Sequence, residues 1–167
     1  MDEYKSDKQY LSWNLIDGYV SSLHYKLLNF VDEDEGFVRV GECTEFDRIV
    51  GVERGGCIPG VMMSHRMGLP FTALKWSTRD HVDKDNIIKM LSWNKKSILI
   101  VDDINDSGDT LNGILTRLEH VGSEVKVKTA TLLSKSTSIN KVDYYARELT
   151  TPDELDSWYV FPWEQLN

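Results

Sequence analysis

The stretch 97–111 constrains this chain most, because it combines the patterns of a buried strand, a polar loop and a helix. Its beginning, 97–101, is rich in branched apolar side chains, which favour a strand buried on both faces. Asp102 and Asp103 follow where that strand is predicted to end. From Leu111 onward, apolar residues recur at the spacing of one helix face. A buried strand followed by a helix indicates an α/β fold.

The loop between this strand and this helix is small and polar, and consists of Asp106, Ser107, Gly108, Asp109 and Thr110. Free backbone N–H groups in such a loop, together with the helix N-terminus, form a place where a phosphate can bind. The carboxylates of Asp102 and Asp103 can hold a divalent cation or accept hydrogen bonds from sugar hydroxyls. The segment therefore offers the parts for binding a sugar phosphate and a metal ion.

Other interpretations of this segment can be compared with the residues. A strand that ends in two acids is typical of a Walker B strand, but the chain contains no G-x-x-x-x-G-K-[ST] motif. The residues from Asp103 to Gly108 mimic the start of an EF-hand loop, but the twelfth position is Ile114 rather than Glu. A plain solvated turn with a helix cap stays open, because turns favour the same residue types.

Residues 101–110 read Val-Asp-Asp-Ile-Asn-Asp-Ser-Gly-Asp-Thr and resemble the phosphoribosyl-pyrophosphate signature of type I phosphoribosyltransferases. In that family, a hydrophobic strand is followed by two acids, two variable residues and Asp-Thr-Gly-x-Thr. Ser107 stands where Thr is usual and keeps the hydroxyl, while Asp109 adds a negative charge to the phosphate cradle. The resemblance implies the type I phosphoribosyltransferase fold: a central, mainly parallel sheet flanked by helices, with a small hood formed by the terminal segments.

A second motif, Glu53-Arg54-Gly55-Gly56, follows a strand predicted over 46–52. Adjacent glycines let the backbone approach a ligand closely, and Arg54 supplies a fixed positive fork for an anion. Alone, Arg-Gly-Gly is more often an ordinary turn. Here it resembles the family's pyrophosphate-binding loop, although Glu53 replaces the usual Ser or Ala.

The C-terminal segment, 151–167, places four aromatic residues within the six positions 158–163. A hydrophobic plug or an oligomer contact is one interpretation, and a wall that stacks on a purine is the other. The pattern Asp-Ser-Trp-x-x-x-Pro-Trp-Glu over 156–164 resembles xanthine-guanine and related 6-oxopurine phosphoribosyltransferases, in which an aromatic side chain stacks on the base.

The resemblance extends over 12–164 and implies a role for each residue that matches the family's motifs. For phosphoribosyl pyrophosphate it implies a site made of Arg54, Gly55, Asp102, Asp103, Asp106, Ser107, Gly108, Asp109 and Thr110. For the cofactor, Mg²⁺, it implies the ligands Asp103, Asp102 and Glu164. For the purine base it implies Lys135 as a donor to the 6-oxo group, Trp158 as the stacking ring and the backbone of Tyr159. Among these residues, Asp106 is expected to be catalytic, as a general base near N7 of the purine.

Residues 77–88 are polar and charged, and are predicted to be a mobile loop. In the resembled family, a loop in this place closes over the active site and excludes water. Thr78 stands where many 6-oxopurine members carry Tyr. Arg79 and Lys84 are both candidate contacts for pyrophosphate, and the sequence does not choose between them; Lys84 is included in the predicted site for phosphoribosyl pyrophosphate.

The remaining elements follow from periodicity and turn residues. A helix is predicted to begin after Ser12 and to end near Val31, behind a mobile lead-in over 1–10. Its apolar face comprises Leu15, Ile16, Tyr19, Val20, Leu23 and Leu27. A second helix is predicted to end at Gly68, strands are predicted over 71–76, 124–133 and 142–146, and a turn over 151–155. Together these elements make one domain over 1–167.

Composition limits the partners and the compartment. The net charge of −8 argues against a broad nucleic-acid footprint, which favours a basic surface. No apolar run approaches the roughly 20 residues needed to span a bilayer. Two cysteines are too few for a disulfide framework. We therefore expect a cytoplasmic protein that binds neither nucleic acid nor membrane.

The function implied by the resemblance is purine salvage. The 5-phosphoribosyl group would pass from phosphoribosyl pyrophosphate to guanine, xanthine or hypoxanthine, giving a nucleoside monophosphate and pyrophosphate, in a Mg²⁺-dependent homo-oligomer (dimer or tetramer). Two alternatives stay open: a non-catalytic nucleotide-binding regulator on the same fold, for which Glu53, Thr78 and Asp109 leave room, and a transferase for another base. The sequence does not choose among the three 6-oxopurines.

Overall fold

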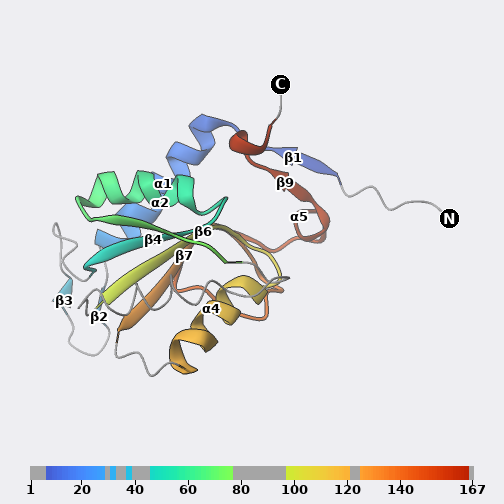
Figure 1. The fold of residues 1–167 in the computed structure, drawn as a ribbon. Helices are drawn as coiled ribbons and strands as arrows, with labels where there is room; N and C mark the ends of the chain where they lie inside the picture. Colours follow the sequence, from blue (N-terminus) through green and yellow to red (C-terminus); the bar gives the residue numbers. More distant parts are fainter. Residues whose placement is uncertain are drawn as a thin grey trace.

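A five-stranded parallel sheet lies at the centre of the computed structural model, which describes residues 7–28, 31–32, 37–38, 46–76, 97–120 and 125–165 (Figure 1). The spatial order of the strands is β5 (Phe71–Leu74), β4 (Arg48–Val52), β6 (Ser97–Asn105), β7 (Lys126–Lys135) and β8 (Tyr144–Leu149). Every neighbouring pair is parallel. All their carboxyl ends therefore meet at one edge, where open α/β sheets bind ligands.

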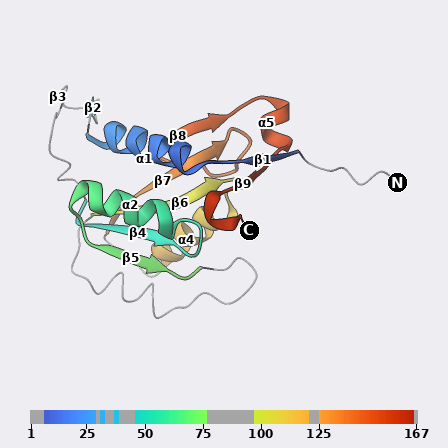
Figure 2. The ribbon, with the colours of Figure 1, turned by 90° about the horizontal axis from the view of Figure 1, so that it is seen from above.

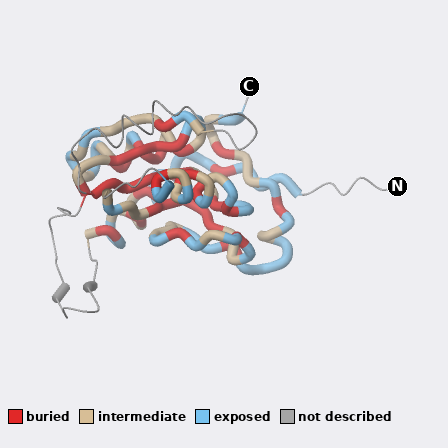
Figure 3. The backbone as a smooth tube through the Cα atoms, turned by 60° about the horizontal axis from the view of Figure 1, so that its bottom comes forward, coloured by how far each residue is buried: buried red, intermediate tan, exposed pale blue. Residues whose placement is uncertain are grey.

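Helices cover both faces of the sheet, because the central strands carry buried side chains on both faces. The helices α1 (Trp13–Leu28) and α2 (Cys57–Met67) lie over one face, and α4 (Asp109–His120) lies over the other (Figure 2). Leu99 and Val101 of β6 pack with the first pair of helices, whereas Ile98 and Ile100 pack with α4. Successive side chains of a strand point to opposite faces, so the run 97–101 is buried on both sides. Figure 3 shows the buried backbone gathered in the interior of the molecule.

Segments from the two ends of the chain form a hood beside the core. The hood consists of β1 (Lys8–Tyr10), α5 (Pro152–Asp156), β9 (Trp158–Val160) and the 3₁₀ turn η1 (Pro162–Glu164). β1 pairs with β9 in parallel. Leu11 and Phe161, which flank this pair, are buried in the main core and anchor the hood there. The predicted hood of terminal segments is confirmed, as is the mainly parallel sheet flanked by helices.

Several predicted boundaries are wrong, each for a physical reason. Residues 8–10 form β1 rather than a mobile lead-in, because their backbone pairs with β9. β6 does not end at Val101, because its ladder with β7 continues to the pair Asn105 and Ser134. The predicted turn over 151–155 is the helix α5, which a complete capping box stabilises.

The remaining differences are smaller. α1 begins as predicted, with Ser12 Oγ accepting from the Leu15 N–H (3.3 Å), but it ends at Leu28. Leu15 was placed on the apolar face by its spacing, yet it is 39% exposed. The backbone near the predicted helix end forms the short antiparallel pair β2 (Val31–Asp32) and β3 (Phe37–Val38). Among the described helices, none is both long and apolar enough to span a bilayer.

Candidate active site

The Arg-Gly-Gly loop, residues 54–56, lies directly on the carboxyl end of β6. A Cβ atom on Gly55 would collide with the carboxylate of Asp103, and one on Gly56 would collide with the Val101 carbonyl and lie 2.7 Å from the Asp102 Cα. Gly56 itself has an ordinary right-handed backbone (φ −68°). Both glycines are therefore needed because the loop approaches the two acids so closely.

The start of this loop is tied to the neighbouring strand. The Glu53 N–H donates to the Leu74 carbonyl at the end of β5 (2.9 Å), and the Glu53–Arg54 peptide bond is cis. The side chains of Glu53 and Arg54 are exposed. The predicted positive fork is therefore available to an anion in front of the sheet edge, with a carboxylate beside it in the sequence.

Burial and mutual repulsion disfavour two full negative charges on Asp102 and Asp103, the acid pair. Burial raises the pKa of Asp102 well above its ordinary value, and the neighbouring Asp103 charge raises it further. Burial raises the pKa of Asp103 to about 6, although the Ile104 N–H, which donates to its Oδ1 (2.8 Å), opposes the rise. The pair can thus both donate to and accept from sugar hydroxyls near neutral pH.

The loop after β6 is held in place by the loop after β7. The Ile139 N–H donates to the Ser107 carbonyl (2.9 Å). Gly108 has φ +95°, and a Cβ atom there would lie 2.6 Å from Ser138 Oγ and 2.7 Å from the Asn140 N atom. Glycine is therefore required at 108 both by its backbone and by its neighbours.

Asn105 is a supporting residue that sequence reasoning missed. Its side chain is buried, and its Nδ2 donates to the Asn140 carbonyl (2.8 Å) and to Ser134 Oγ (3.2 Å). It thereby ties the end of β6 to β7 and to the loop beyond it. The available signal was a polar residue directly before the predicted phosphate-binding loop. The family pattern treats this position as variable, so it did not mark Asn105.

The predicted phosphate cradle contains an internal hydrogen bond. Ser107 Oγ donates to Asp109 Oδ2 (2.9 Å) and accepts from the Asp109 N–H (3.3 Å). Asp109 opens α4, where a carboxylate is favoured by the positive end of the helix dipole. The added charge therefore stabilises the helix start, and it also occupies the end of the helix that a phosphate would use.

Lys135 and Asp106, two residues predicted for base chemistry, form an ion pair. Lys135 Nζ lies 2.7 Å from Asp106 Oδ1. The lysine side chain is 14% exposed and the aspartate side chain 56% exposed. Lys135 was predicted just past its strand but is the last residue of β7, so its backbone is fixed by the sheet. Their roles stay predictions.

The hood brings the C-terminal predictions to the same edge. Trp158 is 58% exposed. The Glu164 charge contributes to the raised pKa of Asp103, and Glu164 Oε2 accepts from the Phe161 N–H (3.0 Å). The side chain of Tyr159 is half-buried, with its pKa raised by burial.

Mg²⁺ prefers carboxylate oxygens and usually keeps waters and substrate phosphates in its coordination shell. Within the described ranges, no three His, Cys, Asp or Glu side chains are arranged to hold a metal ion by themselves. The Glu164 charge nevertheless contributes to the raised pKa of Asp103, so the two carboxyls interact electrostatically. This donor set fits an ion completed by a bound pyrophosphate, and Asp102, Asp103 and Glu164 stay predicted ligands.

The predicted mobile loop, 77–88, lies outside the described residues, and so do Thr78, Arg79 and Lys84. The predictions made for that loop are therefore untested.

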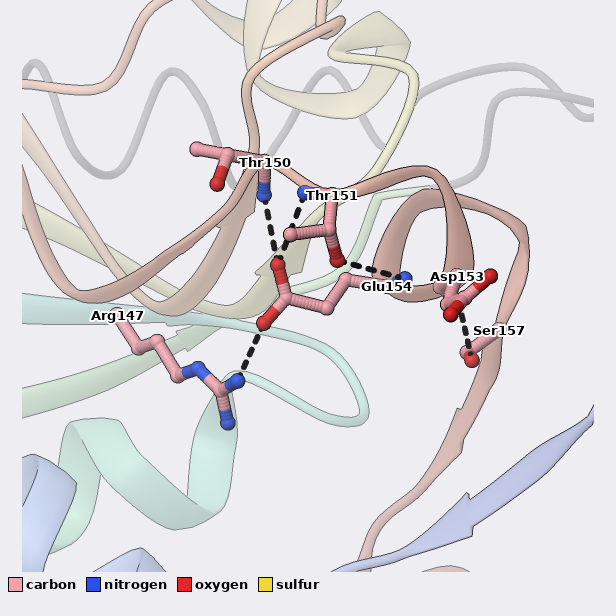
Figure 4. Close-up of polar contacts among 6 residues, drawn as sticks. All are labelled: Arg147, Thr150, Thr151, Asp153, Glu154 and Ser157. Carbon is pink, nitrogen blue, oxygen red and sulfur yellow. Dashed lines mark hydrogen bonds and ion pairs between the residues drawn. The ribbon is translucent and has the colours of Figure 1, made fainter.

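Arg147 and Glu154 form a second cluster that sequence reasoning missed (Figure 4). Arg147 NH2 lies 2.5 Å from Glu154 Oε1. Both line a hollow of about 320 Å³ together with Leu15 and Tyr159. The signal was present in the sequence: Thr151-x-x-Glu154 is a capping-box pattern and Pro152 suits a helix start, but the segment is too short to show helical periodicity.

Comparisons with known proteins agree with this geometry. Residues 42–165 match the family described as phosphoribosyl transferase domain. A xanthine-guanine phosphoribosyltransferase of Idiomarina loihiensis is 25% identical over 126 residues, which cover 72% of this chain and 72% of that protein. A second one, of Cereibacter sphaeroides, is 28% identical over 123 residues, covering 70% of this chain and 68% of that protein. The crystal structure of a purine phosphoribosyltransferase from Pyrococcus horikoshii Ot3 superposes with a TM-score of 0.67 at 29% identity, covering 96% of each chain.

Proposed function

Because the chain belongs to the type I phosphoribosyltransferase family, we propose that it is a purine-salvage enzyme. It would transfer the 5-phosphoribosyl group from phosphoribosyl pyrophosphate to guanine, xanthine or hypoxanthine, and release pyrophosphate and the nucleoside monophosphate. The observation that carries this proposal is the close seating of the Arg-Gly-Gly loop on the acid pair, with Gly55 against Asp103. It brings an anion-binding loop and two sugar-binding carboxyls to one point.

The chemistry requires groups that stabilise charge on both sides of the breaking bond. Positive charge develops on the ribose and negative charge on the departing pyrophosphate. The acid pair would bind the ribose hydroxyls with its negative charge nearby, and Arg54 would bind the pyrophosphate. A bound Mg²⁺ would neutralise phosphate charge, with Asp103, Asp102 and Glu164 as its protein ligands.

The incoming base loses a proton as its bond to the ribose forms. Asp106 would accept it, as a general base near N7 of the purine. Lys135, which is held beside Asp106 at 2.7 Å, would donate to the 6-oxo group. Trp158 would stack on the ring, and the Tyr159 backbone would hydrogen-bond the opposite edge. The 5′-phosphate would bind the backbone of residues 106–110.

The relatives named above also support coarser expectations about partners and place. Phosphoribosyl pyrophosphate and a purine base are the expected substrates, and neither nucleic acid nor a membrane is an expected partner. We propose that the enzyme acts in the cytoplasm as a dimer or tetramer.

A regulator that binds a nucleotide without turnover is the second candidate. The observation that favours it is the exposed Glu53 carboxylate in the predicted pyrophosphate loop. A pyrophosphate bound there would meet a like charge, whereas a nucleoside monophosphate carries no group at that place.

The deciding experiment mixes the protein with phosphoribosyl pyrophosphate, Mg²⁺ and one of guanine, xanthine, hypoxanthine or adenine, and follows nucleotide formation by chromatography. Turnover of at least one 6-oxopurine, without adenine, is expected. Turnover of adenine alone would point to another base class. Nucleotide binding without any turnover, in protein shown to be folded, would support the regulator instead.

A further inference from the structure

The helix α5 connects the two walls of the predicted base site. One wall is Lys135, whose Cα partner on β8 is Leu149. The other wall is Trp158, which begins β9. Between Leu149 and Trp158 the chain passes only through residues 150–157, most of which belong to α5. The placement of α5 therefore sets where Trp158 stands relative to Lys135.

A single carboxylate organises this connection, as Figure 4 shows. Glu154 Oε2 accepts from the N–H groups of Thr150 and Thr151 (both 3.0 Å), and the Glu154 N–H donates to Thr151 Oγ1 (3.4 Å). These bonds and the nearby Arg147 charge lower the pKa of Glu154 to about 2. Glu154 is therefore ionised throughout the working range of pH.

Arg147 joins this carboxylate to the core. Its guanidinium donates to Glu154 Oε1 and also interacts with Tyr19 of α1, and both contacts raise its pKa. Arg147 stands on β8 opposite Leu133 of β7. The Arg147–Glu154 contact, called the clamp below, thus links the hood to the sheet and to a core helix at once.

The far end of α5 passes this placement directly to Trp158. The Ser157 N–H and its Oγ both interact with the Asp153 carbonyl (3.1 and 2.6 Å). The next N–H, of Trp158, donates to the Asp7 carbonyl (2.9 Å). A shift of α5 is therefore transmitted to the tryptophan without an intervening flexible segment.

An open hollow of about 320 Å³ lies beside the clamp and is lined by both clamp residues, by Leu15 and by Tyr159. Leu155 of α5 packs against the main core, whereas Glu154 of α5 is held by the polar contacts described above. Loss of the clamp therefore removes the polar attachment of α5 to β8 and leaves the packing of Leu155.

We propose that the clamp is a positioning device for purine recognition, in which Arg147 and Glu154 hold Trp158 at the stacking distance from a base bound to Lys135. This inference rests on the proposed function. Neither clamp residue touches a substrate. Loss of the clamp should therefore weaken binding of the base and leave the phosphoribosyl pyrophosphate site, which is built on the sheet edge, unchanged.

The test replaces Glu154 and Arg147 separately, as Glu154→Gln and Arg147→Gln, and measures steady-state kinetics with both substrates. We expect KM for the purine to rise about tenfold, KM for phosphoribosyl pyrophosphate to stay within about twofold, and Arg147→Lys to recover part of the loss. Asp17→Asn is the matched control, because it removes another exposed ion pair, that with Arg66, away from the hood. It should change neither KM.

A second readout separates positioning from general destabilisation. Calorimetry would compare binding of ribose 5-phosphate with binding of the monophosphate of the base that turns over fastest. Glu154→Gln should weaken only the nucleotide. Equal weakening of both ligands, or an unchanged KM for the purine, would overturn the proposal. Glu154→Asp, a shorter carboxylate, gives the same comparison if Glu154→Gln does not fold.

The two hypotheses fail in different ways. If the wild-type protein turns over no base, the proposed function fails before any variant is compared. If the wild-type protein is active and the clamp variants match it, only the positioning inference fails.

Discussion

The sheet edge and the hood hold their predicted site residues by different means. At the sheet edge, Gly55 and Asp103 are in contact so close that no side chain fits between them, and Asn105 below them is fully buried. In the hood, Leu11 and Phe161 are buried anchors. The helix α5 is also held by polar contacts, one of them between Glu154 and Arg147, whose side chain is 48% exposed. The Arg-Gly-Gly loop and the acid pair are thus held in place by close packing, whereas exposed polar contacts supplement the packing of Leu155 in holding α5, next to Trp158.

Gly55→Ala would break the sheet edge most severely. The added methyl group would meet the Asp103 carboxylate, so either the loop or the acid must move. We expect kcat/KM to fall about a hundredfold or more in the forward assay. Gly18→Ala is the control: nothing lies within 4 Å of a Cβ there, and alanine should stabilise α1 by about 1 kcal/mol with unchanged activity. Full activity of Gly55→Ala would show that the close approach is dispensable.

Asp106→Ala tests the chemistry that the sheet edge is proposed to perform. The variant loses the proposed proton acceptor and releases Lys135 from its ion pair. We expect kcat to fall by about ten- to a hundredfold, with the affinity for ribose 5-phosphate unchanged, measured by single-turnover kinetics and calorimetry. Unchanged turnover would remove Asp106 from its proposed role.

Asp103→Asn should lower activity but raise stability. Close packing at the sheet edge buries the Asp103 carboxylate, and its negative charge is unfavourable there. The folded pKa of Asp103, about 6, lies above its unfolded value, so the folded state binds the proton more tightly. The contribution of Asp103 to wild-type stability is therefore highest below the unfolded pKa, and it falls as pH rises through about 4 to 6. The variant lacks this loss and should be more stable at pH 7.5 by on the order of 3 kcal/mol. Metal-free urea denaturation at several pH values measures the difference; an equal difference at pH 3.5 would contradict this origin.

Thr151→Ala should give the smallest effect and sharpen the comparison. It removes the hydroxyl that accepts from the Glu154 N–H, which weakens the start of α5 by about 1 kcal/mol. Hydrogen exchange should become faster at α5 and β9 while β6 and β7 stay protected, because exposed units open separately from the core. Equal acceleration in both regions would mean that hood and sheet open as one unit.

The parts of the fold that sequence predicts well are those whose signal is local. The apolar run 97–101, the polar loop after it and the helical spacing from Leu111 each carry their own pattern, and the structure has a strand, a loop and a helix there, with the helix beginning two residues earlier, at Asp109. Lys135 and Asp106 are also brought together because adjacent parallel strands end at the same edge. Their positions at one edge follow from the mainly parallel sheet, which the family resemblance implied.

The parts that sequence missed depend on distant partners. β6 extends to Asn105 because β7 offers a ladder partner, which the polar residues 102–105 do not reveal. Lys8–Tyr10 are exposed and polar in pattern, and they form a strand only because residues 158–160 provide a matching backbone. The clamp could not be predicted from the sequence for the same reason. Arg147 and Glu154 form it only because the fold brings them together, with Tyr19 beside Arg147 and the hollow beside both.

The pairing of β1 with β9 also has a consequence for the order of events during biosynthesis. Lys8 pairs with Trp158, so the first strand waits while about 150 further residues are made. At ordinary rates of translation this interval is on the order of ten seconds. The parallel core can assemble while the hood is still incomplete, because none of its strands needs β9. Trp158 and the strand β1 that pairs with it should therefore be among the last parts of the nascent chain to reach their final places.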